Sequence, residues 1–119
     1  MKTKIDKLLI QLINLHPKYI DLSLDRIKAL LNKLGNPHLN LSPTIHIAGT
    51  NGKGSTLSYL KHILNYNGYS VNAYISPHLS KFNERIVLNN KEVSTGKLLN
   101  CLKYVKSINQ GKPITFFEI

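Results

Sequence analysis

One short stretch, residues 44–56, constrains the fold more than any other part of the sequence, TIHIAGTNGKGST. It begins with Ile45 and Ile47 alternating with other residues, which is typical of a β-strand. Three glycines, Lys53 and two hydroxyl residues follow, and a helical pattern begins after them. Glycines let successive backbone N–H groups point at an anion, a helix N-terminus attracts negative charge, and a lysine adds a point charge. The stretch therefore predicts a strand, a phosphate-binding loop and a helix.

This loop is a variant of the common Walker pattern. Ile47 stands where the first glycine of that pattern belongs, and Gly54 separates Lys53 from Ser55. A hydroxyl group, from Ser55 or Thr56, would reach a magnesium ion. The alternative is an ordinary turn rich in glycine and asparagine. The strand pattern before the loop and the helix pattern after it favour phosphate binding.

Apolar residues recur at the three- and four-residue spacing of an amphipathic helix in four segments. Two segments precede the loop, one follows it directly, and one lies near the C-terminus, where Ser94 is expected to cap the helix. The apolar positions are Ile5, Leu8, Leu9, Leu12 and Ile13; Leu24, Ile27, Leu30, Leu31 and Leu34; Leu57, Leu60, Ile63 and Leu64; and Leu98, Leu99, Leu102, Val105 and Ile108.

A second strand is expected at residues 71–75, where Val71, Ala73 and Ile75 alternate with polar neighbours. Strand, loop, helix and strand make one βαβ unit, whose strands are parallel and whose crossover is right-handed. Further on, residues 86–93 predict a small β-excursion around Asn89-Asn90-Lys91. The fold class is therefore α/β with an incomplete sheet, because so few strands cannot bury both faces of a parallel sheet.

The composition limits the class of partner. A chain of 119 residues, 42% of them hydrophobic, has enough apolar residues for one small domain with a core. Its net charge of +10 permits binding to nucleic acid, a membrane surface or a polyanionic substrate. The lysines are spread along the chain without a run of five basic residues, so nucleic acid is not the expected partner. Cys101 is the single cysteine and no apolar run approaches a membrane span, so we expect a cytoplasmic protein without membrane contact.

The block that follows the second predicted strand, residues 76–86, is SPHLSKFNERI. Ligands of an open α/β sheet bind outside the carboxyl ends of its strands, so Ser76 is expected on the side of the phosphate loop, where it would share a magnesium ion. His78, Glu84 and Arg85 would lie on a loop that covers the site. The alternative is an ordinary Ser-Pro turn with a surface ion pair.

Four ordered motifs together resemble the folylpolyglutamate synthase/dihydrofolate synthase family, a branch of the Mur-ligase-like ATP-dependent amide ligases. Their order and spacing agree with that family, and the resemblance covers essentially the whole chain, including residues 20–26. It implies the N-terminal part of a P-loop, Mur-ligase-type central ATPase domain with parallel strands, preceded by two helices. The motifs are Ala-Gly-Thr-Asn-Gly-Lys-Gly-Ser at 48–55, Ser-Pro-His-Leu at 76–79, Asn-Glu-Arg-Ile at 83–86 and Thr-Phe-Phe-Glu at 115–118.

The resemblance implies ligase chemistry that uses ATP and Mg²⁺. Such enzymes phosphorylate a carboxylate of dihydropteroate or a folate, and the amine of L-glutamate then attacks the acyl phosphate to give an amide and release phosphate. Because phosphorylation supplies a good leaving group, the protein's task is mainly positioning and charge neutralisation. The expected partners are therefore ATP, a pteroate or folate, and L-glutamate.

The same resemblance implies roles for individual residues. Lys53 would be catalytic, Ser76 would be a magnesium ligand, and a flat pteroate ring would need stacking partners and a few polar groups. From the residues alone, Phe116 and Phe117 also fit a buried strand after the turn at 111–113, and both roles can hold at once. The residues expected to hold the ATP phosphates are Thr50, Asn51, Gly52, Lys53, Gly54 and Ser55. The residues expected to line the pteroate site are Asp21, Leu22, Ser23, Thr115, Phe116, Phe117 and Glu118.

The sequence departs from the family in small and large ways. Ser23 stands where many members have glycine, and Asp25 where they often have glutamate. Family members are also much longer, so residues 1–119 are expected to be a truncated N-terminal part of the ATP-binding domain without the C-terminal ligase domain. A later glutamate, a histidine and a carbamylated lysine, all expected from the resemblance, are missing.

A chain of this kind is expected to be inactive alone, and to be either a remnant of a disrupted gene or one half of a split enzyme that needs a second polypeptide. The competing hypothesis is a non-catalytic module that binds a nucleotide or another polyanion. A basic nucleic-acid-binding domain is a further class, and it predicts binding that weakens steeply with salt.

Overall fold

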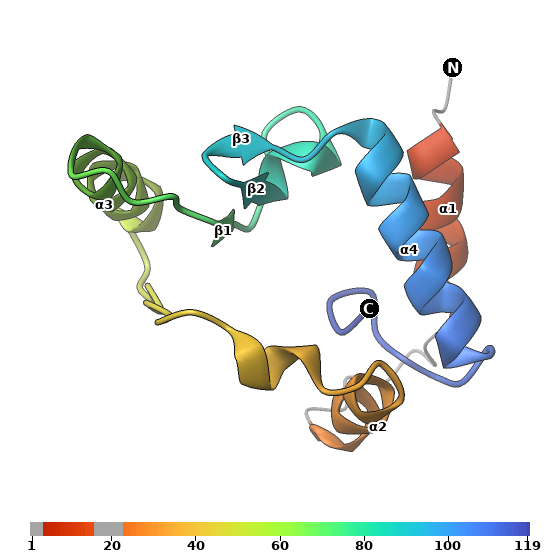
Figure 1. The fold of residues 1–119 in the computed structure, drawn as a ribbon. Helices are drawn as coiled ribbons and strands as arrows, with labels where there is room; N and C mark the ends of the chain where they lie inside the picture. Colours follow the sequence, from red (N-terminus) through yellow and green to blue (C-terminus); the bar gives the residue numbers. More distant parts are fainter. Residues whose placement is uncertain (1–3, 16–22) are drawn as a thin grey trace. The chain divides into compact units, whose positions relative to one another are not determined.

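The computed structural model describes residues 4–15 and 23–119. The chain separates into two compact units, a first unit of residues 1–42 and 99–119 and a second unit of residues 43–98. Figure 1 traces the helices and strands along the chain.

The first unit is built from helices. They are α1 (Lys4–Ile13), α2 (Asp25–Lys33), the short 3₁₀ helix η1 (Pro37–Asn40) and most of α4 (Thr95–Asn109). The two helices predicted before the loop are thus confirmed. α1 lies along α4, where the Lys106 Nζ donates to Gln11 Oε1 at 2.8 Å (Figure 1). Of the predicted apolar positions of α1, Ile5, Leu8 and Leu12 are buried, whereas Leu9 is half-buried and Ile13 is exposed. Ile114 adds to the buried residues of this unit.

The second unit contains helix α3 (Lys53–Tyr66), a small sheet and the 3₁₀ helix η2 (Phe82–Arg85). The strands are β1 (Ala73–Tyr74), β2 (Ile86–Leu88) and β3 (Lys91–Glu92), and they lie in the order β1-β2-β3. Both pairs are antiparallel, with Ala73 opposite Val87 and Val87 opposite Glu92. The first turn of α4 follows, and the Ser94 Oγ accepts the Lys97 N–H at 3.3 Å, as expected of a cap.

The predicted β-excursion is confirmed as a hairpin between β2 and β3. Asn89 and Asn90 form its two-residue turn with φ of 48° and 67°, a conformation that asparagine tolerates better than most residues. Asparagine side chains also tie this turn to the preceding segment. Asn72 Oδ1 accepts the Asn89 N–H, and Asn90 Oδ1 accepts the Val71 N–H, each at 2.8 Å.

The α/β class and the incomplete sheet are confirmed, but the predicted parallel pairing is wrong for the part of the chain that the structure describes. Residues 44–47 form no strand, Ile45 is 64% exposed, and the second predicted strand shortens to β1. Parallel strands depend on neighbours remote in sequence and on helices covering both faces. Alternation alone therefore does not pair residues 44–47, whereas the local Asn-Asn turn suffices for β2 and β3.

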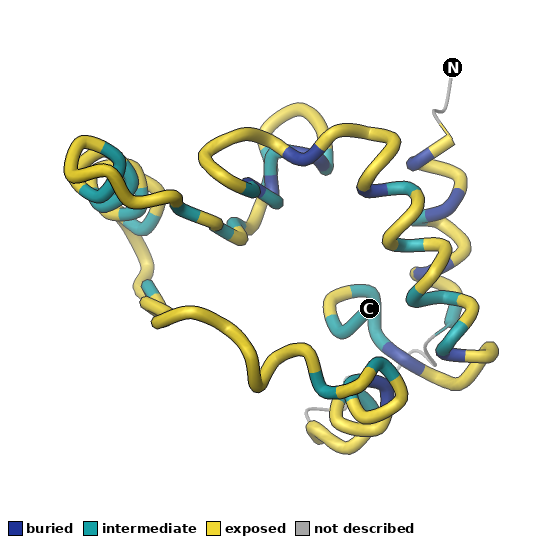
Figure 2. Tube along the Cα trace, in the orientation of Figure 1, coloured by how far each residue is buried: buried dark blue, intermediate teal, exposed yellow. Residues whose placement is uncertain are grey.

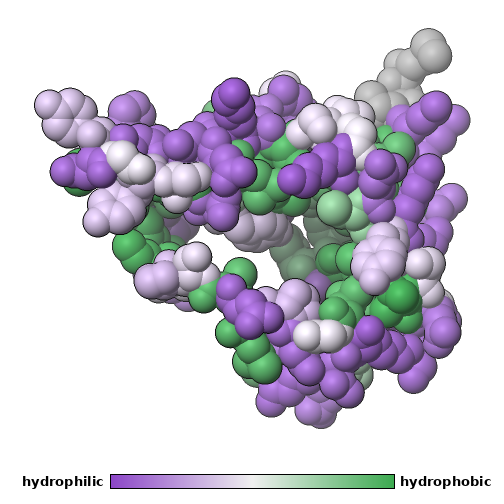
Figure 3. All heavy atoms as spheres, in the orientation of Figure 1, coloured by the Kyte–Doolittle hydropathy of each residue, from purple (hydrophilic) through white to green (hydrophobic). Residues whose placement is uncertain are grey.

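Burial is uneven along the chain (Figure 2). α3 contains no buried residue among those described, and Tyr59, Ile63 and Tyr66 on it are 70%, 59% and 93% exposed. Figure 3 shows hydrophobic residues at the surface between hydrophilic ones. Within the described ranges, no helix is long and apolar enough to span a membrane. The buried hydrophobic residues are Ile5, Leu8, Leu12, Leu30 and Ile114 in the first unit and Val87, Val93 and Leu98 in the second.

Candidate functional site

The predicted phosphate loop turns directly into α3. Gly52 precedes the helix with φ of 76°, and Gly49 has φ of 151°, conformations that suit glycine because it has no Cβ. In this fully described stretch, no side chain caps α3 and no acidic residue lies in its first turn. The first N–H groups of a helix have no acceptor within the helix. The N-terminus of α3 is therefore a positively polarised end without a protein carboxylate on its own first turn.

Lys53 folds back over this loop. Its Nζ donates to the carbonyl oxygen of Gly49 and, at 3.2 Å, to that of Thr50. Ser55 and Thr56 are both exposed, and the Thr56 hydroxyl donates to the Gly52 carbonyl at 2.9 Å. The loop thus gathers its lysine ammonium and its helix N-terminus around one short turn.

The residues of this loop fit a phosphate group. A Cβ built at Gly52 or Gly54 would meet no atom within 4 Å, so the loop is open to a ligand. No group of three or more His, Cys, Asp and Glu side chains that could hold a metal occurs among the described residues. Mg²⁺ bound with a nucleotide usually takes its ligands from phosphates, water and one or two protein groups, so a serine hydroxyl suits this role without a carboxylate cluster.

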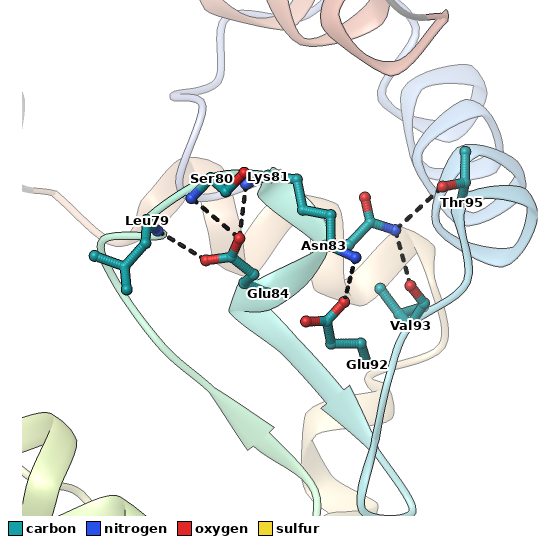
Figure 4. A network of polar contacts seen from close by, with 8 residues as sticks. All are labelled: Leu79, Ser80, Lys81, Asn83, Glu84, Glu92, Val93 and Thr95. Carbon is teal, nitrogen blue, oxygen red and sulfur yellow. Dashed lines mark hydrogen bonds and ion pairs between the residues drawn. The ribbon is translucent and has the colours of Figure 1, made fainter.

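Glu84 organises the loop that follows β1. Its Oε2 accepts the Leu79 N–H at 2.8 Å, and its Oε1 accepts the N–H groups of Ser80 and Lys81 at 3.0 and 2.8 Å (Figure 4). The hydrogen bonds from Lys81 and Leu79 hold the pKa of the Glu84 carboxyl below its ordinary value. Glu84 is therefore the acceptor that orders three backbone donors of this loop.

Arg85 joins the Ser-Pro-His-Leu motif to the Asn-Glu-Arg-Ile motif. It is only 7% exposed; its Nε donates to His78 Nδ1 at 2.8 Å and its Nη1 to Ser76 Oγ at 3.3 Å. Its guanidinium also lies over the Phe82 ring, 5.3 Å from the centroid. The bond to His78 requires an Nδ1 without a proton. The hydroxyl of Ser76, the predicted magnesium ligand, thus accepts a hydrogen bond from Arg85.

The other end of this loop is tied to the hairpin and to α4. The buried Asn83 donates from Nδ2 to the Val93 carbonyl at 2.8 Å and to Thr95 Oγ1 at 3.5 Å. An ion pair of 2.8 Å joins Lys81 to Glu92 (Figure 4). These contacts join η2 to the hairpin and to the first turn of α4.

The predicted substrate segment at the C-terminus forms a helical turn. Glu118 Oε2 accepts the Thr115 N–H at 2.7 Å, and Thr115 Oγ1 accepts the Glu118 N–H at 3.2 Å. This reciprocal pair is a capping box, and the bond from the Ile119 N–H to the Thr115 carbonyl, 3.2 Å, is the first helical one. The strand offered above for Phe116 and Phe117 is therefore wrong. Phe117 is 66% exposed, and its ring meets that of Phe116 edge to face at 5.5 Å.

Arg26 connects this turn to the N-terminal substrate segment, of which Asp21 and Leu22 lie outside the described residues. Its Nε lies 3.3 Å from Glu118 Oε2, its Nη2 lies 3.3 Å from Glu118 Oε1, and its Nη1 lies 3.5 Å from Ser23 Oγ. The structure thus brings Ser23 together with Thr115 and Glu118 through a residue that sequence analysis missed. Nothing local indicates this pair, whereas the spacing of Thr115 and Glu118 is a readable capping-box signal.

A pocket of about 330 Å³ also lies in the first unit, between α2 and the segment that follows α4. Arg26, Lys33 and Lys112 belong to its lining, but Ser23 and residues 115–118 are not among the described residues that line it. Ser23, Thr115 and Glu118 therefore gather around Arg26 and not around this pocket.

Comparison with known proteins places these features in context. No family model matches the sequence. Dihydrofolate synthetase of Saccharomyces cerevisiae is 37% identical over 102 residues, which cover 84% of this chain and 24% of the yeast protein. Dihydrofolate synthase/folylpolyglutamate synthase of Bacillus subtilis is 40% identical over 103 residues, covering 81% of this chain and 24% of that relative. The chain therefore spans about a quarter of the length of these relatives.

Solved structures have the same fold. Escherichia coli FolC in complex with DHPP and ADP matches with a TM-score of 0.84 and 35% identity, over 98% of this chain and 28% of that one. The bifunctional folylpolyglutamate synthase/dihydrofolate synthase of Yersinia pestis, complexed with AMPPNP and a Mn ion, matches with a TM-score of 0.78 and 33% identity, over 93% of this chain and 28% of that one.

Proposed function

This chain belongs to the folylpolyglutamate synthase/dihydrofolate synthase family, and we propose that it is the phosphate-binding part of an ATP-dependent ligase. The observation that carries the proposal is the turn into α3, where Gly52 leads into an uncapped helix N-terminus and Lys53 lies over the loop. An ammonium group and open backbone N–H groups are what a polyphosphate needs.

The proposed reaction is the ATP-dependent addition of L-glutamate to dihydropteroate or tetrahydrofolate through an acyl phosphate. ATP supplies the phosphoryl group that activates the carboxylate. Residues 50–55 would hold the ATP phosphates, and Lys53 would exchange its bonds with the loop carbonyls for bonds with phosphate oxygens. Support comes from the relatives, since the Yersinia pestis structure holds AMPPNP with Mn and the Escherichia coli structure holds ADP with DHPP.

Ser76 would bind the magnesium ion of the nucleotide. Its hydroxyl oxygen accepts one hydrogen bond, from Arg85, and a hydroxyl oxygen has two lone pairs. One lone pair therefore remains for a metal, and Arg85 fixes the direction in which it points.

The remaining parts of the proposal concern the whole protein. Because the chain spans about a quarter of its relatives, we propose that residues 1–119 are the N-terminal part of the ATP-binding domain. Residues 1–119 alone would not turn over substrate, because they match only about a quarter of these relatives. The location that the single cysteine suggests is the cytoplasm.

Isothermal titration of the purified chain with Mg-ATP tests this proposal, first alone and then with dihydropteroate added. Lys53→Ala removes the ammonium group from the loop, and Lys61→Ala on the same helix is the matched control. We expect saturable Mg-ATP binding that is lost in Lys53→Ala and kept in Lys61→Ala.

The other outcomes separate the competing functions. Mg-ATP binding without any response to dihydropteroate would favour the non-catalytic nucleotide-binding module. Absence of Mg-ATP binding by a chain that still melts cooperatively would overturn the proposal. Binding to DNA or RNA that weakens steeply with salt would favour the nucleic-acid-binding class.

A further inference from the structure

We propose that Arg26 is a positioning residue of the substrate site, where it holds the carboxylate of Glu118 and the hydroxyl of Ser23. The proposal rests on the proposed function, because it concerns the dihydropteroate site of that ligase. It adds Arg26 to the residues that serve the site.

Arg26 and Glu118 form a bidentate ion pair. Two nitrogens of Arg26 face the two carboxylate oxygens of Glu118, each at 3.3 Å. A planar guanidinium that meets a carboxylate in this way fixes orientation as well as distance, which a lysine at the same place would not do. The third nitrogen of Arg26 reaches the Ser23 hydroxyl at 3.5 Å, so one side chain contacts both predicted substrate segments.

The Arg26–Glu118 ion pair is partly shielded from water. The side chains of Arg26 and Glu118 are 17% and 13% exposed, whereas the Lys81–Glu92 pair of the second unit is 62% and 45% exposed. Shielded charges interact more strongly than solvated ones and hold their geometry better. The Arg26–Glu118 ion pair therefore differs from the exposed ion pairs that contribute little to stability.

Three hydrogen-bond donors of the protein occupy most of the acceptor positions of the Glu118 carboxylate. Its Oε2 accepts both the Thr115 N–H, at 2.7 Å, and the Arg26 Nε–H, and its Oε1 faces Arg26 Nη2. Burial raises the pKa of Glu118, but the Thr115 N–H and the Arg26 guanidinium lower it more strongly, so the group stays ionised at neutral pH. Glu118 thus anchors the turn that carries Phe116 and Phe117, and Arg26 holds that turn against Ser23.

Titration of the full chain with dihydropteroate in the presence of saturating Mg-ATP tests the inference. The variants are Arg26→Gln, Arg26→Lys, Glu118→Gln and the double variant, with Lys28→Gln on the exposed side of α2 as the control. We expect each of the first three to weaken dihydropteroate binding by about tenfold, because a charge-assisted contact is lost. The double variant should be no weaker than the single ones, since the two residues act as one unit. Mg-ATP affinity should stay unchanged in all of them.

The outcomes distinguish this inference from the function on which it rests. Equal dihydropteroate affinity of the wild type and of both Arg26→Lys and Glu118→Gln would overturn it and leave the ligase function standing. Loss of dihydropteroate and Mg-ATP affinity together in every variant would overturn it too, because that pattern means general unfolding. A wild-type chain that binds Mg-ATP but no dihydropteroate would overturn the inference and would also favour the non-catalytic nucleotide-binding module over the ligase. A wild-type chain that binds neither removes the proposed function as well.

Discussion

Gly52 and Gly54 lie two residues apart in the phosphate loop, yet the backbone uses them differently. Gly52 has φ of 76°, in the left-handed region, whereas Gly54 lies inside α3 and has no positive φ. A Cβ built at either position meets no atom within 4 Å. Substitution by alanine therefore tests backbone conformation alone at both positions, without a steric contribution.

We expect Gly52→Ala to lower the free energy of unfolding by about 1 kcal/mol, because an L-residue is strained in the left-handed region. Gly54→Ala should raise it by about 0.5 kcal/mol, since alanine loses less backbone entropy in a helix. Urea denaturation followed by circular dichroism measures both values. A stabilising Gly52→Ala would contradict the loop geometry described here.

The segment of residues 76–85 is held together as one element, although its only regular structure is the short 3₁₀ helix η2. Glu84 accepts hydrogen bonds from Leu79, Ser80 and Lys81, and Arg85 donates to Ser76 and His78. Two adjacent side chains of opposite charge thus organise the whole loop, one through its backbone donors and the other through its side chains. This explains in physical terms why the two motifs belong together.

The pKa of Glu84 makes this loop sensitive to acid. Because the pKa is lower in the folded chain than in the unfolded one, the ionised carboxylate stabilises the fold above the ordinary carboxyl pKa. This stabilisation is lost as the pH falls through the lowered pKa of the folded state. We expect Glu84→Gln to unfold at lower urea concentration than the wild type at neutral pH, and the difference to shrink towards about pH 3.

Urea titrations across this range measure the effect, and Glu92→Gln is the control because the Glu92 carboxylate forms an ion pair with the exposed Lys81. Its effect on stability should be small. A difference between Glu84→Gln and the wild type that stays constant down to low pH would show that ionisation of Glu84 is not what holds the loop.

Elements that depend on neighbouring residues could be predicted from the sequence. The helices, the Ser94 cap and the hairpin at Asn89-Asn90 follow from spacing and turn chemistry within a few residues. The strand at 44–47 could not be settled in this way, since pairing needs partners from elsewhere in the chain. Arg26 lies 92 residues from Glu118, so no pattern within either segment reveals their contact. Thr115 and Glu118 are the intermediate case, because their spacing indicates a helix cap, although only a substrate role was predicted for them.

At the scale of the whole molecule, charge is the dominant feature. The sequence has 16 lysines and arginines against 6 acidic residues, and its net charge is +10. Several lysines, among them Lys28, Lys97 and Lys103, are exposed and lie on different helices or turns of the chain. Like charges repel one another and favour expansion of the chain, and salt screens this repulsion.

We therefore expect the free energy of unfolding to rise when NaCl increases from about 0.02 M to about 0.3 M, because the Debye length falls over this range to below the distance between many of the charges. The triple variant Lys28→Gln, Lys97→Gln and Lys103→Gln removes three exposed charges, and its stability should depend less on salt. Urea denaturation of both chains at each salt concentration is the measurement. If salt changes the free energy of unfolding of both chains equally, it acts on the burial of apolar surface, because that contribution does not depend on the charges of the protein. If the wild type becomes less stable with salt, its ion pairs outweigh the repulsion, and the exposed Lys81–Glu92 pair, which salt screens more than the shielded Arg26–Glu118 pair, would be the first place to look.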